Sequence, residues 1–337
     1  MGSIIVVLVA ILSIVKRDSS DVALLALTLS QALGVTQFLK VVVTSSAQFE
    51  SRFNSVERLL AYWDLPQEAP AYLPGKEAPD AWPKKGALEY KDVWMRYRAE
   101  LGPVLKGVTF SVAPGEKVGI VGRTGSGKSS LIVSLFRLVE PYQGSIVLDG
   151  IDLLSLGLND IRSRIAVIPQ DPMLFSGSVR ANLDPYDRYT DADVWEALAH
   201  VGMRDPVAAL PDGLAARVAE GGDNFSVGQR QLFCVARALL RKPQVLVADE
   251  ATASVDSETD TLIQQTIRRE FWHCTSLTIA HRINTILDAT KVLVMENGKV
   301  AEYDTVARLM SQETSSLRAM AEEAGVGSQY RVVPGRM

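Results

Sequence analysis

Hydrophobic residues dominate the start of the chain, where they form two runs separated by a short polar segment. The first run covers Ser3 to Val15, and the second covers Val22 to Val43 with a single charge at Lys40. A helix needs about 20 apolar residues to cross a bilayer. The second run therefore predicts a transmembrane helix, whereas the first is too short for a complete span. The first run also lacks the basic start and the small-residue cleavage site of a signal peptide.

Polar positions of the second run fall on one side of the predicted helix. Ser30, Gly34 and Gln37 are spaced at i, i+4 and i+7, and in a membrane such a stripe faces other helices or a water-filled path. Packing against neighbouring helices and contact with a transported substrate both fit this pattern. A pair of buried helices in a soluble protein is the alternative interpretation of the whole apolar start.

The pattern becomes amphipathic after the second run and then loses its period. Apolar residues at helical spacing predict that the helix continues into the cytosol; they are Phe49, Phe53, Val56 and Leu60. The stretch from Leu65 to Lys85 holds five prolines and no period, which is typical of a linker. We interpret residues 1–64 as the C-terminal end of a transmembrane domain that begins inside a truncated span, and residues 65–87 as the linker.

Short apolar runs alternate with helical stretches over residues 88–325, which predicts an α/β fold. The runs at 88–95 and 108–112 are expected to form strands of an edge sheet. Five further runs have the continuous apolar character of buried, mostly parallel strands; they lie at 117–121, 165–168, 245–249, 276–280 and 291–295. Asn297-Gly298 predicts a hairpin after the last of these runs. Residues 326–337 form a tail.

Charge and cysteine content limit the class of protein. The chain has 35 Lys+Arg against 39 Asp+Glu, a net charge of -4, and only five of these charges fall within residues 1–48. This slightly acidic balance argues against a nucleic-acid binder, which needs a basic patch. Cys234 and Cys274 lie in apolar runs, so we expect buried free thiols in a cytosolic body. His200 and His273 match no motif and are expected to be structural or surface residues.

A glycine-rich loop between the run at 117–121 and a helical stretch carries the strongest chemical signal. The pattern G-x-x-x-x-G-K-S is typical of a phosphate-binding P-loop when a strand precedes it and a helix follows. Glycines let successive N–H groups surround an anion, and the helix N-terminus adds positive potential. Lys128 is expected to contact the β- and γ-phosphates, and Ser129 to bind Mg²⁺. The expected ATP-binding residues of the loop are Gly122, Arg123, Thr124, Gly125, Ser126, Gly127, Lys128, Ser129 and Ser130.

An acidic pair follows the apolar run that begins at Val245. Asp249 and Glu250 come at its C-terminal end, which in an open α/β sheet is the edge where nucleotide phosphates bind. A carboxylate at the position of Asp249 suits Mg²⁺. Glu250 is one residue further on and is expected to polarise an attacking water. This pair and the P-loop together predict a site for nucleotide hydrolysis.

The segment Phe225-Ser226-Val227-Gly228-Gln229 precedes a helical run and lies some 15 residues before the apolar run that ends in this acidic pair. Here the chain resembles the nucleotide-binding domain of ATP-binding cassette (ABC) transporters, whose signature is close to LSGGQ. Phe225 and Val227 depart from the commonest form. The departure is similar to that of the second cassette in the multidrug-resistance-associated branch (subfamily C). GRTGSGKSSL, IPQDPMLFSGSVRANLDP and DEATASVD resemble the same branch.

The resemblance spans about Leu88 to Ala324 and implies the P-loop NTPase fold of an ABC cassette. Such a cassette has a RecA-like core, an antiparallel β subdomain and an α-helical subdomain, preceded here by α-helical transmembrane segments. In this family two cassettes sandwich two ATP molecules. The resemblance therefore implies that Phe225, Ser226, Val227, Gly228 and Gln229 contact the ATP of a partner cassette.

Four further residues take their expected roles from the resemblance alone. Tyr97 matches the aromatic that stacks on adenine, and Gln170 matches the glutamine that reaches Mg²⁺ and the attacking water. Asp256 matches the D-loop aspartate between cassettes, and His281 matches the histidine that contacts the γ-phosphate. The expected catalytic residues are thus Glu250, His281, Gln170 and Lys128, and the expected Mg²⁺ residues are Ser129, Gln170 and Asp249.

These expectations combine into an ATPase that drives export across a membrane, with ATP and Mg²⁺ as cofactors. The expected partners are transmembrane domains, the bilayer and a second cassette from upstream sequence or another chain, with no nucleic acid. The protein is expected to be multi-pass, with the cassette in the cytosol. An ATP-gated channel or regulatory subunit of the same subfamily is one alternative, and a soluble ABC ATPase is another. Organic anions or conjugates are the subfamily's substrates by analogy only.

Overall fold

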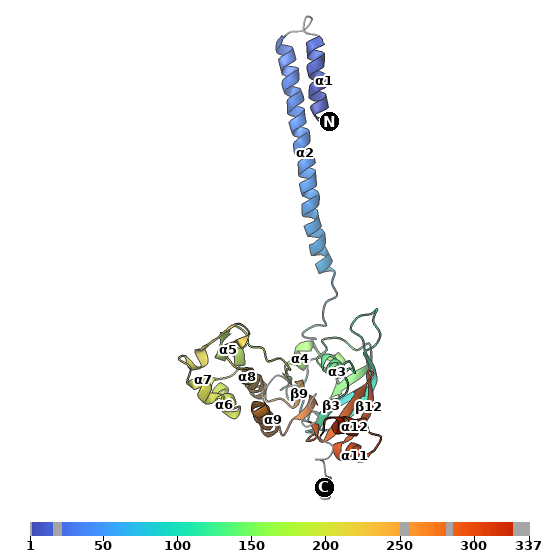
Figure 1. The fold of residues 1–337 in the computed structure, drawn as a ribbon, viewed down its shortest axis with the longest axis vertical. Helices are drawn as coiled ribbons and strands as arrows, with labels where there is room; N and C mark the ends of the chain where they lie inside the picture. The colour runs from blue at the N-terminus through green and yellow to red at the C-terminus, as the bar shows by residue number, and fades with distance from the viewer. Residues whose placement is uncertain (1, 16–21, 250–256, 281–285, 326–337) are drawn as a thin grey trace. The chain divides into compact units, whose positions relative to one another are not determined.

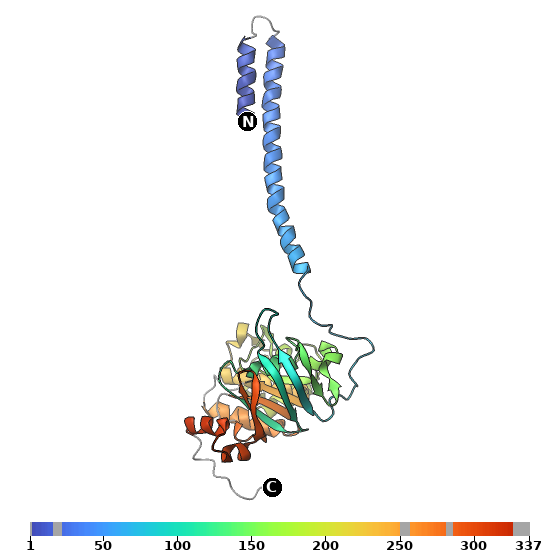
Figure 2. The same ribbon diagram turned by 90° about the vertical axis from the view of Figure 1, so that its right-hand side faces the viewer.

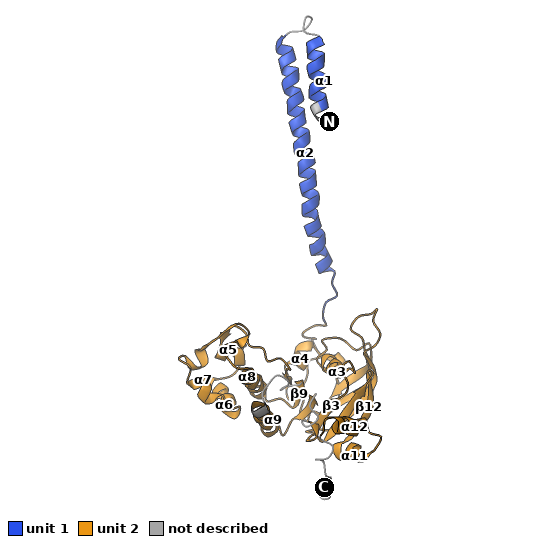
Figure 3. Ribbon diagram, in the orientation of Figure 1, with its two compact units in different colours: residues 1–68 blue, residues 69–337 orange. Residues whose placement is uncertain are grey.

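The structure is a computed structural model, and it describes residues 2–15, 22–249, 257–280 and 286–325. Two compact units divide the chain, residues 1–68 and residues 69–337 (Figure 3). Of the predicted site residues, Glu250, Asp256 and His281 lie outside the described part.

Two helices that lie side by side make up the first unit (Figures 1 and 2). Helix α1 covers Gly2–Val15, and helix α2 covers Val22–Trp63 without a break. Within the described residues, α2 is the one helix that is long and apolar enough to cross a membrane, while α1 is apolar but shorter. The 42 residues of α2 correspond to about 63 Å of helix. A single rigid element therefore includes both the apolar run and the amphipathic segment that follows it.

Helix α1 covers only one face of α2. The buried or half-buried residues of α2 share that face at helical spacing, and they are Leu25, Leu29, Ala32 and Thr36. The predicted polar stripe of Ser30, Gly34 and Gln37 is exposed and lies on a different face. The stripe takes no part in the packing of this unit.

Two main sheets form the second unit (Figure 2). The antiparallel sheet has the order β2-β1-β4-β5, with bounds β1 Leu88–Met95, β2 Leu105–Val112, β4 Gln143–Leu148 and β5 Ile151–Asp152. The six-stranded sheet has the order β12-β11-β3-β10-β9-β6. Its strands are β3 Lys117–Val121, β6 Ile165–Ile168, β9 Val245–Asp249, β10 Thr275–Ile279, β11 Lys291–Glu296 and β12 Lys299–Thr305. All of them run parallel except β12, which is antiparallel to β11. A two-stranded sheet pairs β7 (Gly177–Ser178) with β8 (Arg217–Val218).

This arrangement confirms the predicted α/β fold. The strands expected at 88–95, 117–121, 165–168 and 245–249 have those bounds. Asn297 and Gly298 join β11 to β12 with φ of 48° and 81°, the left-handed conformation that a two-residue hairpin turn favours. The residue pattern was sufficient for β3, β6 and β9 because buried parallel strands are apolar over most of their length.

Helices of the second unit pack in three groups. Helix α3 (Lys128–Leu135) lies between the two sheets, since Leu131 and Leu135 share one core with strands of both. A helical lobe has its own core, and its helices are α5 Val179–Leu183, α6 Asp191–His200, α7 Arg204–Ala208, α8 Val227–Leu240 and α9 Ser257–Glu270. Helices α11 (Val306–Ser311) and α12 (Ser316–Glu323) pack against β11. The shorter helical segments are α4 Leu158–Arg162 and the 3₁₀ turns Leu153–Ser155, Gly213–Ala215 and Glu220–Gly222.

Residues 70–87, here called the docked segment, lie on the surface of the second unit although the sequence has the character of a linker. The backbone N–H of Leu158 donates to Pro70 O at 3.1 Å. Trp82 is buried, and its indole N–H donates to Leu148 O at 2.9 Å. Arg164 donates to three further carbonyl groups of the segment, which are Pro79 O at 3.0 Å, Asp80 O at 2.9 Å and Trp82 O. Carbonyl groups make most of these contacts, so the proline-rich composition does not prevent docking.

Both cysteines are free and buried, as predicted. Burial raises the pKa of Cys234, and burial raises the pKa of Cys274 to about 11. Because the thiolate is the reactive form of cysteine, we expect neither to react with a maleimide at about pH 7 in the native chain. Both should react in urea, as read by intact-protein mass spectrometry. Labelling of either thiol in the native chain at the rate of a small thiol would contradict this burial.

Candidate functional site

Strand β3 and helix α3 place the predicted P-loop at the carboxyl edge of the six-stranded sheet. β3 lies between β11 and β10, and the loop leads from Val121 at its end to Lys128, the first residue of α3. The first N–H groups of a helix have no partner within the helix. They and the positive end of the helix dipole therefore face the loop, which is suited to bind an anion.

Three glycines of the loop have a positive φ, and at Gly122 there is also no room for a side chain. Gly122 has φ 150°, and a Cβ at this position would lie 2.3 Å from Met295 O on β11. Gly127 has φ 104°, and a Cβ there would lie 3.2 Å from Leu105 Cδ2. Gly125 has φ 80° but open space around it. The loop thus needs glycine at Gly122 for close packing, and the positive φ of Gly125 and Gly127 favours glycine at these two positions.

Lys128 reaches back over the loop that precedes it. Its side chain is buried, and Nζ donates to Gly122 O at 2.8 Å and to Arg123 O at 3.2 Å. This geometry holds the ammonium group at the centre of the loop, where it adds a full charge to the N–H dipoles. Ser129 is exposed next to it, so its hydroxyl is accessible to a metal ion on a bound phosphate.

Tyr97 lies beside the P-loop helix although 33 residues separate it from Ser130. It follows β1, its ring is exposed, and its Oη lies 3.0 Å from Ser130 Oγ. Ser130 is itself buried in the first turn of α3. The structure thus brings the predicted adenine-stacking residue next to the predicted phosphate site.

Asp249 and Gln170 lie at the same sheet edge as the P-loop. Asp249 is the last residue of β9, which β10 separates from β3. Gln170 is exposed and follows β6, whose Ile168 pairs with Ala248 of β9. Because the carboxyl ends of parallel strands meet at one edge, Asp249 and Gln170 both follow strands that end at the same sheet edge as the P-loop.

Residues of the predicted signature begin helix α8 in the helical lobe. Ser226 caps this helix and accepts a hydrogen bond from the N–H of Gln229 at 3.2 Å, while the Gln229 side chain accepts from the N–H of Ser226 at 3.0 Å. Phe225 is buried edge-on against Phe233, with ring centroids 5.1 Å apart. Ser226 is exposed and Gly228 is buried without a side chain, which leaves the helix N-terminus accessible for an anion.

The signature and the P-loop belong to different lobes of the second unit. Helix α8 packs in the core of the helical lobe, and α3 packs between the sheets (Figure 1). The structure therefore places the predicted signature apart from the predicted phosphate site of the same chain.

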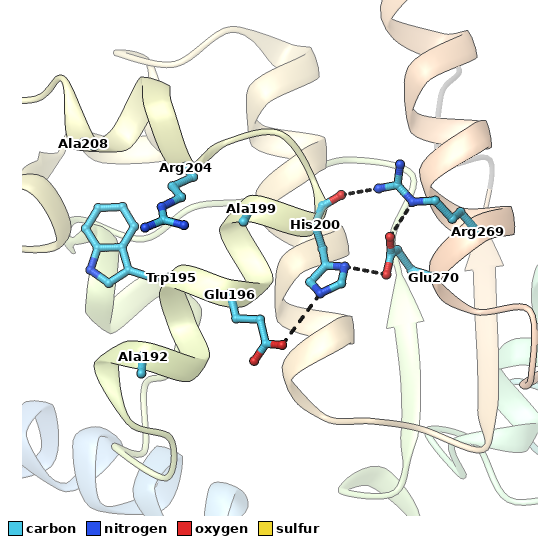
Figure 4. A pocket seen from close by; sticks show the side chains of 9 residues that line it. All are labelled: Ala192, Trp195, Glu196, Ala199, His200, Arg204, Ala208, Arg269 and Glu270. Carbon is cyan, nitrogen blue, oxygen red and sulfur yellow. Dashed lines mark hydrogen bonds and ion pairs between the residues drawn. The ribbon is translucent and has the colours of Figure 1, made fainter.

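A hollow between α6 and α9 contains none of the predicted site residues (Figure 4). His200 Nδ1 lies 2.7 Å from Glu270 Oε2, and Arg269 donates to His200 O at 2.7 Å. These contacts join the end of α6 to the end of α9. They agree with the structural role expected for His200, and His273 is exposed next to Trp272.

Sequence reasoning missed one set of polar contacts near the site. Gln231 and Arg237 of α8 donate to backbone carbonyls on the loop that carries Gln170. A signal was present, because Arg237 interrupts an otherwise apolar run, LFCVARALL. Burial holds the pKa of Arg237 below its usual value, and the nearby Cys234 offsets only part of this effect.

Comparisons with known proteins show what the chain is similar to. The family model described as "ABC transporter" matches residues 105–253. Over 97% of this chain, 48% of residues are identical to "ATP-binding cassette sub-family C member 2" of Rattus norvegicus. The same identity and coverage hold for "ATP-binding cassette sub-family C member 3" of Mus musculus. The chain spans 21% of the length of each of these relatives.

A solved structure shows the same fold. The "Structure of a bacterial Atm1-family ABC exporter with ATP bound" superposes with a TM-score of 0.72 and 30% identity, over 90% of this chain and 53% of that chain. Fold and site together define a P-loop nucleotide-binding domain of the ABC cassette type. The chain belongs to the ABC transporter family, and its sequence is that of sub-family C, the multidrug-resistance-associated branch.

Proposed function

We propose that this chain binds ATP with Mg²⁺ at the P-loop, hydrolyses it together with a partner cassette, and uses the cycle to drive export across a membrane. The observation that carries this proposal is the P-loop geometry, with buried Lys128 at the centre of the loop and Asp249 at the same sheet edge. Membership of sub-family C supports organic anions or conjugates as the exported class.

Different protein groups contact the adenine, the phosphates and the metal ion in this proposal. Tyr97 stacks on the adenine, the loop N–H groups surround the phosphates, and Lys128 contacts the β- and γ-phosphates. Ser129, Gln170 and Asp249 supply a hydroxyl, an amide and a carboxylate. This donor set suits Mg²⁺, which is usually held by one or two carboxylates together with water and substrate phosphates. Bound there, Mg²⁺ would neutralise charge on the phosphates.

Hydrolysis is assigned to Glu250 and His281 by the family pattern. Glu250 accepts a proton from the attacking water, whose oxygen bonds to the γ-phosphorus while the bond to the β–γ bridging oxygen breaks. His281 contacts the γ-phosphate, and Gln170 orients the water. The products are ADP and inorganic phosphate.

The partner cassette completes each half-site. The exposed start of α8 at Ser226 offers N–H groups and a helix dipole to the γ-phosphate held by another cassette. The signature residues Phe225 to Gln229 and the D-loop Asp256 therefore act between cassettes. ATP stabilises the closed pair and hydrolysis releases it, which is a ligand-driven population shift.

Helix α2 places the protein in a membrane in this proposal. Its apolar length and the exposed polar stripe of Ser30, Gly34 and Gln37 fit a helix that packs against further transmembrane helices. The protein is then a multi-pass membrane protein with its cassette in the cytosol.

Replacement of Glu250 by Gln tests the mechanism. We expect ATP hydrolysis at least about 10²-fold slower, because general-base assistance by the carboxylate is lost. ATP affinity should be retained, since the P-loop is unchanged. The measurement is phosphate release from proteoliposomes that hold the full chain with its membrane domains and a partner cassette.

Hydrolysis in Glu250→Gln at the parent rate would contradict the proposed mechanism. Transport is tested in the same vesicles with an anionic conjugate such as a glutathione adduct. Uptake that follows ATP turnover supports an exporter, whereas passive conductance after ATP binding alone would show a channel instead.

A further inference from the structure

The loop after β6 is exposed at its tip but fixed along its backbone to the signature helix. Met173 and Phe175 have exposed side chains. In contrast, the side-chain amide of Gln231 on α8 donates to Pro169 O at 3.1 Å, and Arg237 donates to Met173 O at 2.8 Å. One helix therefore holds the loop on both sides of Gln170.

A second group of contacts closes the far end of the loop. Arg237 donates to the backbone oxygen of Asn182 at 2.6 Å and to its side-chain oxygen at 2.9 Å. Asn182 is buried, and its amide group donates to Phe175 O at 2.8 Å and to Ser178 O at 3.0 Å. These hydrogen bonds thus attach the loop to α8 at both of its ends.

The side chain of Gln231 lowers the stability of the folded state at its position. Its side chain is 0% exposed, and its Oε1 atom is buried with no hydrogen-bond partner in the described residues. A buried acceptor without a partner destabilises the folded state, and leucine at this position would avoid the cost. Among the described residues, the side-chain amide of Gln231 donates to Pro169 O, the carbonyl directly before Gln170.

We propose that Gln231 is a positioning residue that couples the two ATP sites of a cassette pair. Ser226, which caps α8 and faces the partner's ATP, lies five residues before Gln231, or about 7.5 Å along the helix. Movement of α8 when the signature engages ATP is conveyed through Gln231 to Pro169 and so to Gln170. The chain's own site then reaches its hydrolytic geometry only when the partner's nucleotide is in place. This inference rests on the proposed function.

Replacement of Gln231 by Leu separates positioning from stability. We expect kcat for ATP hydrolysis about tenfold lower because Gln170 is misplaced, while KM stays within about twofold because the P-loop is untouched. The thermal unfolding midpoint should be unchanged or higher, since the unpaired oxygen is removed. Hydrolysis is measured in the same proteoliposomes, and unfolding of the full chain in detergent.

Val235 on the same helix supplies the matched control. It is fully buried and apolar, so Val235→Ala should lower the unfolding midpoint and leave kcat unchanged at temperatures where the protein is folded. A combined variant gives a second readout. If Gln231 acts through Gln170, Gln231→Leu in a Gln170→Ala background should cause no further loss, whereas independent effects would multiply.

Three results would overturn the proposal, and each differs from a failure of the proposed function. They are an unchanged kcat in Gln231→Leu, a lower unfolding midpoint that accounts for the loss, and multiplied losses in the combined variant. Parent protein that hydrolyses ATP no faster than Glu250→Gln would instead reject the proposed function itself. Parent activity that depends on Glu250 with normal Gln231→Leu turnover rejects only the coupling.

Discussion

Replacement of Lys128 by Met is expected to weaken ATP binding by about 150-fold in Kd, or about 3 kcal/mol. The Lys128 ammonium lies 2.8 Å from Gly122 O at the centre of the loop, so a phosphate held there would make a charge-assisted hydrogen bond with it. Methionine has a similar length and no charge. The measurement is titration of the full chain with a fluorescent ATP analogue, followed by displacement with ATP.

Lys299 on β12 provides the matched control for this prediction, because it is an exposed lysine outside the site. Lys299→Met makes the same change in net charge and should leave Kd unchanged within about twofold. Equal weakening in both variants would mean that long-range charge, and not contact at the loop, attracts the nucleotide. Full affinity in Lys128→Met would remove the P-loop from the proposed site.

A methyl group at Gly122 is expected to abolish ATP binding and to destabilise the folded chain by about 3 kcal/mol. The added Cβ would lie 2.3 Å from the backbone oxygen of Met295, and a backbone atom in a central strand cannot move aside cheaply. The loop must shift, and its N–H groups then no longer converge on a phosphate. Urea unfolding and the same nucleotide titration measure the two effects for Gly122→Ala.

Gly125→Ala is the control variant, because it adds backbone strain without steric overlap. Gly125 also has a positive φ, at 80°, but a Cβ there meets nothing within 4 Å. We expect a loss of only about 1 kcal/mol from the left-handed backbone. If the two alanine variants lost the same stability, the overlap with Met295 would not be the cause.

Much of this fold could be predicted because its strands and loop are defined by local patterns. Continuous apolar runs predicted the bounds of β3, β6 and β9, since strands of a mostly parallel, buried sheet carry few polar positions. The turn with positive φ at Asn297-Gly298 could likewise be predicted from two residues. Glycine at Gly122 and Gly127 could be assigned to a phosphate loop before the close approach of Met295 and Leu105 was known.

Contacts that depend on backbone carbonyls or on distant partners could not be predicted. The docked segment has a linker's composition, yet Leu158 and Arg164 bind its carbonyl groups, and carbonyls are the same in every residue. The hydrogen bond between Tyr97 and Ser130 joins residues 33 apart. Gln231 looked like an ordinary polar residue near a helix start, and only its complete burial next to Pro169 shows what it holds.

The docked segment also sets the length of the connection between the two units. Helix α2 ends at Trp63, and the first hydrogen bond of the docked segment is at Pro70. Seven residue steps of extended chain reach about 25 Å at most. Because Pro70 is held to the surface of the second unit, residues 64–69 form the connection between the end of α2 and that unit.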